Sequence, residues 1–192
     1  MSRGIPHKTK MLTFSALLAA IGVAIIFVGS LIETLDLSMA ALASFFCLFA
    51  VLEIRGVYPW LIFSVTGILS VVLMPYNLGG WFYLLFFGYY PILKNIIERL
   101  KKPLAWTIKL LICNAAMIAG VLTIFYLLTP DTSGKTVIDA FGYAFGVAEF
   151  GAPIVIGVYL LANVTFVVYD IALSKLIVVY YFKIRKKLKF LK

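Results

Sequence analysis

The sequence predicts an all-α, polytopic integral membrane protein with six transmembrane helices and with the N and C termini in the cytoplasm. Of its 192 residues, 64% are hydrophobic and only 13% are charged, and the mean hydropathy is +1.07. Apolar runs of about twenty residues are typical of bilayer helices, and a soluble domain of this size cannot bury so much apolar surface. Because the connections are short, residues 1–192 are expected to form a single membrane domain.

Positive charges alternate between the two ends of the expected helices. Fourteen of the 17 Lys and Arg precede the first apolar run or follow the second, fourth and sixth runs. The other connections contain one lysine, Lys135, and five acidic residues: Glu33, Asp36, Asp131, Asp139 and Glu149. Since Lys and Arg stay on the cytoplasmic side during insertion, both termini and the basic tail 183–192 are expected there. The protein is expected to lie in the lipid bilayer of the cell membrane.

Turn residues and prolines delimit the elements in order. The expected spans are 11–32, 37–54, 57–74, 80–97, 104–129 and 153–175. The first ends before Glu33, and Asp36 or Ser38 can cap the second. Pro59 lies in the turn into the third span, and Pro75 ends that span.

The later spans contain two informative prolines. Pro91 is expected to kink the fourth span near its cytoplasmic third, and the stretch 94–102 is expected to extend that helix into the cytoplasm. Pro103 opens the fifth span, where a helix tolerates proline. The only long connection follows, and its residues 137–150 could form a short interfacial or re-entrant helix. The sixth apolar run, 153–182, exceeds what a bilayer requires, so it either tilts or projects into the cytoplasm.

Several classes of function are not indicated. The net charge of +9 is interpreted as a set of topological anchors that face anionic headgroups, so nucleic acid is not an expected partner. The sequence contains no phosphate loop, zinc-protease motif or nucleophile-base-acid set, which argues against an intramembrane enzyme. No cofactor is expected. Cys47 and Cys113 lie inside apolar runs and are interpreted as small buried residues. No cluster, including one with His7, has the spacing of a metal site.

Most of the polar residues within the spans lie on the sixth. Five residues at steps of three or four share one face of this helix: Tyr159, Asn163, Phe166, Asp170 and Ser174. A carboxylate that faces lipid costs about 2.5–3.5 kcal/mol, so Asp170 is expected to face the protein interior or water.

A buried Asp170 requires a donor from another helix. Lys175 is a poor partner, because five residues along a helix correspond to about 140° around the axis. The better candidates lie on the fifth and fourth spans: Lys109, Asn114, Tyr90 and Lys94. Three interpretations of Asp170 follow. Its carboxylate forms a hydrogen-bonded pair that locks helices together, it contacts a ligand or ion, or it lies shallow enough to be solvated.

Two further sets could contact a ligand. The fourth span has a stripe of aromatic residues and one lysine: Tyr83, Phe87, Tyr90 and Lys94. Such faces suit a flat heterocyclic or amphiphilic molecule, and they also suit ordinary packing in a membrane. Three acidic residues on the side opposite the basic clusters could form the rim of an outward cavity or simply lie in water: Glu33, Asp36 and Glu149.

The first span has a face of small residues. Ala16, Ala20 and Ala24 repeat at intervals of four, so this face is nearly flat and allows another backbone to come close. It is expected to pack either against a helix of the same chain or against a separate membrane subunit.

The six-span layout and the alanine-rich segment 15–21 resemble the substrate-binding S components of energy-coupling factor transporters. Segments 83–100 and 163–170 also resemble small membrane proteins of Gram-positive bacteria. The resemblance implies binding of a vitamin or metal cation at an outward cavity, and association with a membrane coupling subunit and two ATPases. It implies docking through Ala16, Ala20 and Ala24. The outer loops and later helices would offer these ligand-binding residues: Glu33, Tyr83, Asn114, Glu149, Tyr159, Asn163 and Asp170.

The leading hypothesis is therefore a non-enzymatic membrane subunit that binds a vitamin-like small molecule for uptake together with an energy-coupling ATPase complex. The main alternative is a structural or accessory multi-pass protein without a transported ligand. A third interpretation is a small lipid-handling protein that uses the aromatic fourth span.

Overall fold

The structure is a computed structural model that describes residues 7–32, 35–54, 56–123, 147 and 152–184. Within this part of the chain every regular element is helical, which confirms the all-α class. The elements are α1 (His7–Ser30), α2 (Asp36–Glu53), α3 (Tyr58–Leu73), α4 (Leu78–Phe82), η2 (Tyr83–Phe87), α5 (Tyr90–Ile97), α6 (Lys102–Thr123), α8 (Ala152–Val179) and η5 (Tyr180–Ile184). The expected helix at 137–150 lies almost entirely outside the described residues.

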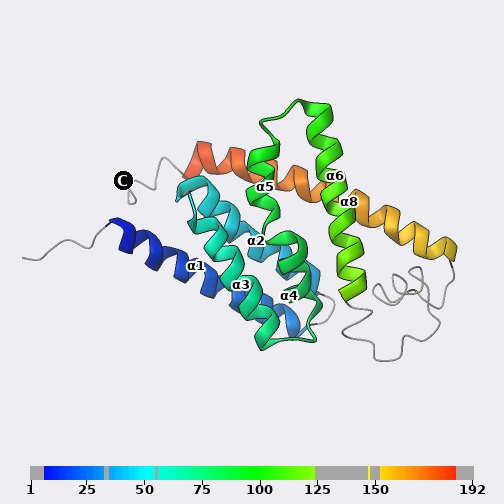
Figure 1. Cartoon of the computed structure of the whole chain (residues 1–192), viewed down its shortest axis with the longest axis horizontal. Coiled ribbons are helices and arrows are strands. Elements are labelled where there is room, and N and C mark those ends of the chain that lie inside the picture. The colour runs from blue at the N-terminus through cyan, green and yellow to red at the C-terminus, as the bar shows by residue number, and fades with distance from the viewer. Residues whose placement is uncertain (1–6, 33–34, 55, 124–146, 148–151, 185–192) are drawn as a thin grey trace, which may run out of the picture.

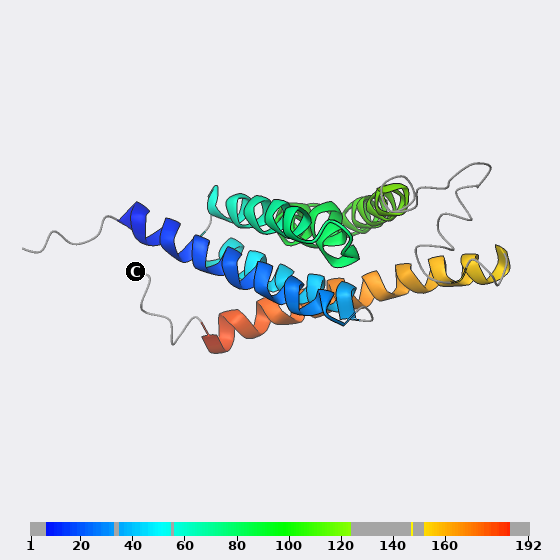
Figure 2. The ribbon, with the colours of Figure 1, turned by 90° about the horizontal axis from the view of Figure 1, so that it is seen from below.

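The helices form two layers (Figures 1 and 2). α1, α2 and α8 lie in one layer, and α3 to α6 lie in the other. α1 packs against α2 and α3, whereas α6 contacts α5, η2 and α8. The largest apolar core lies between α2, η2, α6 and α8, and includes Leu48, Phe86 and Phe166. Cys47 and Cys113 are buried free thiols, which confirms the prediction that they pack as small residues.

Four helices of the described part are long and apolar enough to cross a membrane. They are 8–30 in α1, α2, α6 and the continuous helix 153–183 formed by α8 and η5. α3 is also apolar, but its 16 residues extend only about 24 Å, compared with a hydrocarbon core of about 30 Å. These helices are those of a membrane protein.

The expected fourth span, 80–97, is not one continuous helix. It is divided into α4, the π-helical turn η2 and α5, with Gly88 and Tyr89 between the last two. Pro91 lies in the first turn of α5, where its missing N–H and its ring are tolerated. Ahead of it, the N–H of Gly88 donates to the carbonyl of Tyr83, five residues back, at 2.8 Å. The kink expected at Pro91 is therefore a break that begins earlier, at the π-helical turn.

The prediction that the stretch 94–102 extends the helix of the fourth span is wrong. α5 ends at Ile97, and α6 begins at Lys102 after a short turn. Lys94 is fully buried, so it is not a solvated charge, although the predicted topology counts it among the cytoplasmic cations. Pro103 lies in the first turn of α6, as expected.

Hydrogen bonds of Asn77, in the loop before α4, join the start of α2 to the start of α4. Asn77 Nδ2 donates to Asp36 Oδ1 at 2.7 Å, and Asn77 Oδ1 accepts from the N–H of Gly80 at 2.9 Å. Asn77 therefore caps α4. The prediction that Asp36 or Ser38 caps α2 is wrong, because the residue before α2 is Leu35 and no side chain caps that helix. The Asp36 carboxylate instead stabilises the loop.

Gly79→Ala should destabilise the protein at this contact. The added methyl carbon would lie 2.7 Å from the backbone oxygen of Asp36 and 3.0 Å from Asn77 Oδ1, so the two segments must move apart. We expect a loss of about 1–3 kcal/mol in the free energy of unfolding, measured by denaturation in mixed micelles. Gly157→Ala is the matched control, because a methyl group there meets no neighbouring atom. Equal stability of the two variants would contradict this packing.

Candidate functional site

Asp170 on α8 is the centre of a buried ionic cluster. Its Oδ1 accepts from the Tyr90 hydroxyl at 2.6 Å and from Lys94 Nζ, and its Oδ2 accepts from Lys109 Nζ at 3.0 Å. The side chains of Lys94, Lys109 and Asp170 are only 0%, 5% and 4% exposed. Tyr90 and Lys94 lie one turn apart on α5 and Lys109 lies on α6, so the cluster joins three helices.

Glu98, just after α5, completes the cluster on its more exposed side. Its Oε1 lies 2.7 Å from Lys94 Nζ and 3.3 Å from Lys109 Nζ, and its side chain is 40% exposed. Two ammonium groups thus face two carboxylates, and the formal charges cancel. Lys109 also lies 5.3 Å from the centre of the Trp106 ring, an additional favourable contact for a cation. Because each charged group has a partner, the cluster suits a fixed connection between helices better than an open site.

Asp170 lies in the interior of the protein, where the sequence places it. The prediction that Asp170 is an interior group with partners on the fourth and fifth spans is confirmed. Its partners are Tyr90, Lys94 and Lys109. The alternative of a shallow, solvated carboxylate is wrong, because Asp170 is 2% exposed. Lys175 is exposed on α8, in agreement with its position around the helix.

Asn114 belongs to a second polar group rather than to the Asp170 cluster. Its Nδ2 donates to Asn163 Oδ1 at 3.1 Å, and its Oδ1 accepts from the Tyr159 hydroxyl. Asn163 Nδ2 also donates to the backbone oxygen of Tyr159 at 3.0 Å. This group connects α6 with α8 closer to the start of α8, so the polar stripe of the sixth span serves two separate contacts.

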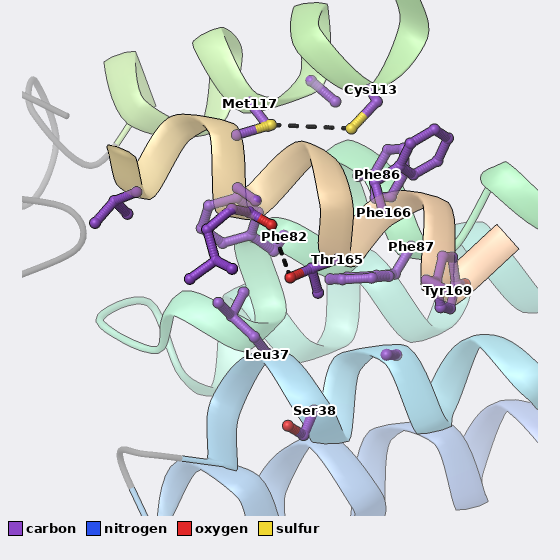
Figure 3. A pocket seen from close by; sticks show the side chains of 15 residues that line it. Leu37, Ser38, Phe82, Phe86, Phe87, Cys113, Met117, Thr165, Phe166 and Tyr169 are labelled. Carbon is purple, nitrogen blue, oxygen red and sulfur yellow. Dashed lines mark hydrogen bonds between the residues drawn. The ribbon is translucent and has the colours of Figure 1, made fainter. Parts of the chain in front are cut away.

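A pocket of about 360 Å³ lies between α2, α4, η2, α6 and α8. Three phenylalanines of the broken fourth span, Phe82, Phe86 and Phe87, line it (Figure 3). Phe166 and Tyr169 of α8 are among its other lining residues. The walls are almost wholly apolar, and two of the polar side chains in the lining have local partners. The Thr165 hydroxyl donates to the carbonyl of Leu161 at 2.9 Å, and the Tyr169 hydroxyl lies 2.7 Å from Ser44 Oγ.

None of the described residues that the resemblance implies as ligand-binding lines this pocket. Tyr159, Asn163, Asn114 and Asp170 bond to one another or to the lysines, and none of them lines the pocket. Tyr83 is fully buried against Phe63. Glu33 and Glu149 lie outside the described residues.

The predicted stripes reach the pocket only in part. Phe87 of the fourth-span stripe and Phe166 of the sixth-span stripe line it, whereas Phe82 and Phe86 were not among the predicted residues. The spacing of four between Phe82 and Phe86 was the available signal. Phe87 is the last residue of the π-helical turn η2, so the pocket combines the predicted stripe with the neighbouring one.

The small-residue face of α1 is exposed. Ala16, Ala20 and Ala24 all face away from the protein, so they do not pack against a helix of the described chain. Contact within the chain uses the adjacent face instead. The Thr66 hydroxyl of α3 donates to the backbone oxygen of Ala19 at 3.3 Å, and a Cβ on Gly22 would meet Thr66 at 3.0 Å.

Comparison of the chain with protein-family models, with curated proteins and with solved structures found no match. Among the described residues, no group of three or more His, Cys, Asp and Glu could hold a metal ion.

Asp170→Asn should strongly destabilise the bundle. The substitution removes the main counter-charge of two buried lysines, and breaking a buried ion pair on one side typically costs about 3–5 kcal/mol. Unfolding in mixed micelles should show a loss of this size. Lys175→Gln, on the same helix but exposed, should change the free energy of unfolding by no more than about 0.5 kcal/mol.

A double variant tests whether the cluster acts as a unit. Asp170→Asn combined with Lys109→Met removes one charge of each sign, so its loss of stability should be smaller than the sum of the single losses. Simple additivity would show that Lys109 and Asp170 do not depend on each other.

Proposed function

We propose that the protein is a non-enzymatic membrane subunit that binds a mostly apolar small molecule for uptake together with an energy-coupling ATPase complex. The observation that carries this proposal is the pocket between α2, η2, α6 and α8. Its volume of about 360 Å³ lies within the range of about 300–1,000 Å³ for small-molecule sites. Phenylalanine rings on several sides favour a flat, largely apolar ring system over a sugar or an ion.

The proposed topology has six crossings of the cell membrane, with both termini in the cytoplasm. α1, α2, α6 and α8 supply the long crossings. α3 and the broken segment α4–η2–α5 would supply two shorter ones. The alternation of basic and acidic connections supports this orientation. Irregular backbone at membrane depth is tolerated where the protein buries it, and Tyr83 at the start of η2 is fully buried.

The exposed face of α1 supports association with a membrane subunit. Ala16, Ala20 and Ala24 present little side-chain volume, so a partner helix can approach closely and gain van der Waals contact. Large apolar residues flank this face, because Leu17 and Phe27 are 56% and 51% exposed. In this proposal the partner is the membrane coupling subunit of a complex with two ATPases.

A structural or accessory role is the second candidate, and the ionic cluster favours it. Asp170 and both lysines bond only to groups of the chain in the described part, and they connect three helices. Such a cluster stabilises a bundle without any ligand. The two functions differ in whether the apolar pocket holds a molecule after mild purification.

Ala162→Phe should empty the pocket. Ala162 lines it, and a phenyl group in its place would fill part of the volume. Native mass spectrometry of the mildly solubilised protein should detect a bound vitamin-like molecule in the wild type, and at least about tenfold less in this variant, which corresponds to about 1.4 kcal/mol.

Ala172→Phe is the matched control, because Ala172 is exposed on the same helix and should leave retention unchanged. A wild-type protein that carries nothing would favour the structural role. A phospholipid in the pocket would instead support the lipid-handling interpretation.

Ala20→Leu should prevent docking without affecting the pocket. The larger side chain would separate the backbones of α1 and a partner helix, so co-purification with a membrane subunit and two ATPases should be lost. Ala115→Leu, at an exposed position of α6, should keep the complex intact. Loss of the complex in both variants would indicate general disruption instead of a specific face.

A further inference from the structure

A second cavity, of about 350 Å³, opens at the end of the molecule where α2 ends and α3 begins. α5 and the terminal turn η5 form its other walls. Its inner part is apolar and buried, with Val51 and Ile92 only 7% and 6% exposed. The α8–η5 helix ends at the same end of the molecule, as Figure 1 shows.

The outer part of this cavity is polar and positively charged. Asn95 and Arg99 line it from α5 and the turn after it, four residues apart, and both are exposed. None of the described residues that line the cavity is acidic. The neighbouring Glu98 contacts Lys94 and Lys109, and no described side chain forms an ion pair with Arg99. Its planar guanidinium therefore remains available for a bidentate contact to an anion.

Two amphipathic aromatic residues form the rim. Trp60 is 42% exposed and Tyr181 is 39% exposed, and both line the cavity. Trp and Tyr are enriched where a membrane protein meets the headgroup region. Lys101, Lys102 and Lys183 are exposed at adjacent chain positions, so the surroundings attract anions as well.

We propose that this cavity binds an anionic phospholipid, with the phosphate diester on Arg99 and Asn95 and with the upper acyl chain along the apolar inner wall. A cationic outer part and an apolar inner part match the two ends of such a lipid. An inorganic phosphate ion would use only the outer part. The site is separate from the apolar pocket, since the two share no lining residue.

Lipid titration of the full-length protein in mild detergent tests this site by native mass spectrometry. Phosphatidylglycerol should be retained in preference to phosphatidylcholine with the same acyl chains. Arg99→Gln should reduce that retention about fivefold, the factor that corresponds to about 1 kcal/mol per cation near an anionic headgroup. Arg99→Lys should restore it only in part, because an ammonium group lacks the forked geometry.

Lys175→Gln is the matched control, since it removes the same charge from an exposed residue that neither lines the cavity nor belongs to the basic surroundings described above. Its retention of phosphatidylglycerol should equal that of the wild type. An equal loss in both variants would show diffuse attraction and overturn the proposal. Displacement of the lipid by millimolar inorganic phosphate would also overturn it, because the site would then recognise a free anion. Neither result depends on the occupant of the apolar pocket.

Discussion

Neutralisation of the Asp170 carboxylate within a bundle of apolar helices constrains the arrangement of α5, α6 and α8. A charge in hydrocarbon is tolerated only with a partner, and here two lysines and a tyrosine from two other helices supply it. The side chains of these residues reach Asp170 only where the helices converge. Their positions therefore determine where α5, α6 and α8 meet. The break before Pro91 separates α5 from α4, so that α5 can take its own direction toward Asp170.

Hydrogen bonds between polar side chains also explain why the walls of the pocket are apolar. Asn114, Tyr159 and Asn163 bond to one another, and the Tyr169 hydroxyl lies within hydrogen-bond distance of Ser44. With these polar groups satisfied, the walls present mostly rings and methyl groups. Recognition in such a pocket depends on shape and on excluded water more than on hydrogen bonds. A molecule that fits would carry few polar atoms.

Sequence patterns predicted the helical class, the interior position of Asp170 and three of its partners. They succeeded there because a carboxylate in an apolar run has few physical alternatives. Lys94 was predicted both as a partner of Asp170 and as one of the cytoplasmic cations, and only the first prediction holds, because the side chain is buried. A cation near the end of a span resembles a topological anchor whether it is solvated or buried. The full lining of the pocket could not be predicted, because it depends on how four helices cross. Phe87 and Phe166 belonged to predicted stripes, but the spacing of four alone did not indicate that Phe82 and Phe86 would join them from the broken fourth span.

The wall that faces the pocket and the groups that hold Asp170 are in direct contact. The ring centroids of Phe86 and Tyr90 lie 5.0 Å apart. The ring centroid of Phe166 on α8 lies 5.6 Å from that of Phe86 and 5.3 Å from that of Tyr90. Phe86 lines the pocket, and Tyr90 donates to the carboxylate. A ligand that displaces Phe86 would therefore also displace Tyr90, the donor to Asp170. Any coupling of this kind is reciprocal, so a change that tightens the ionic cluster would favour binding by the same free energy.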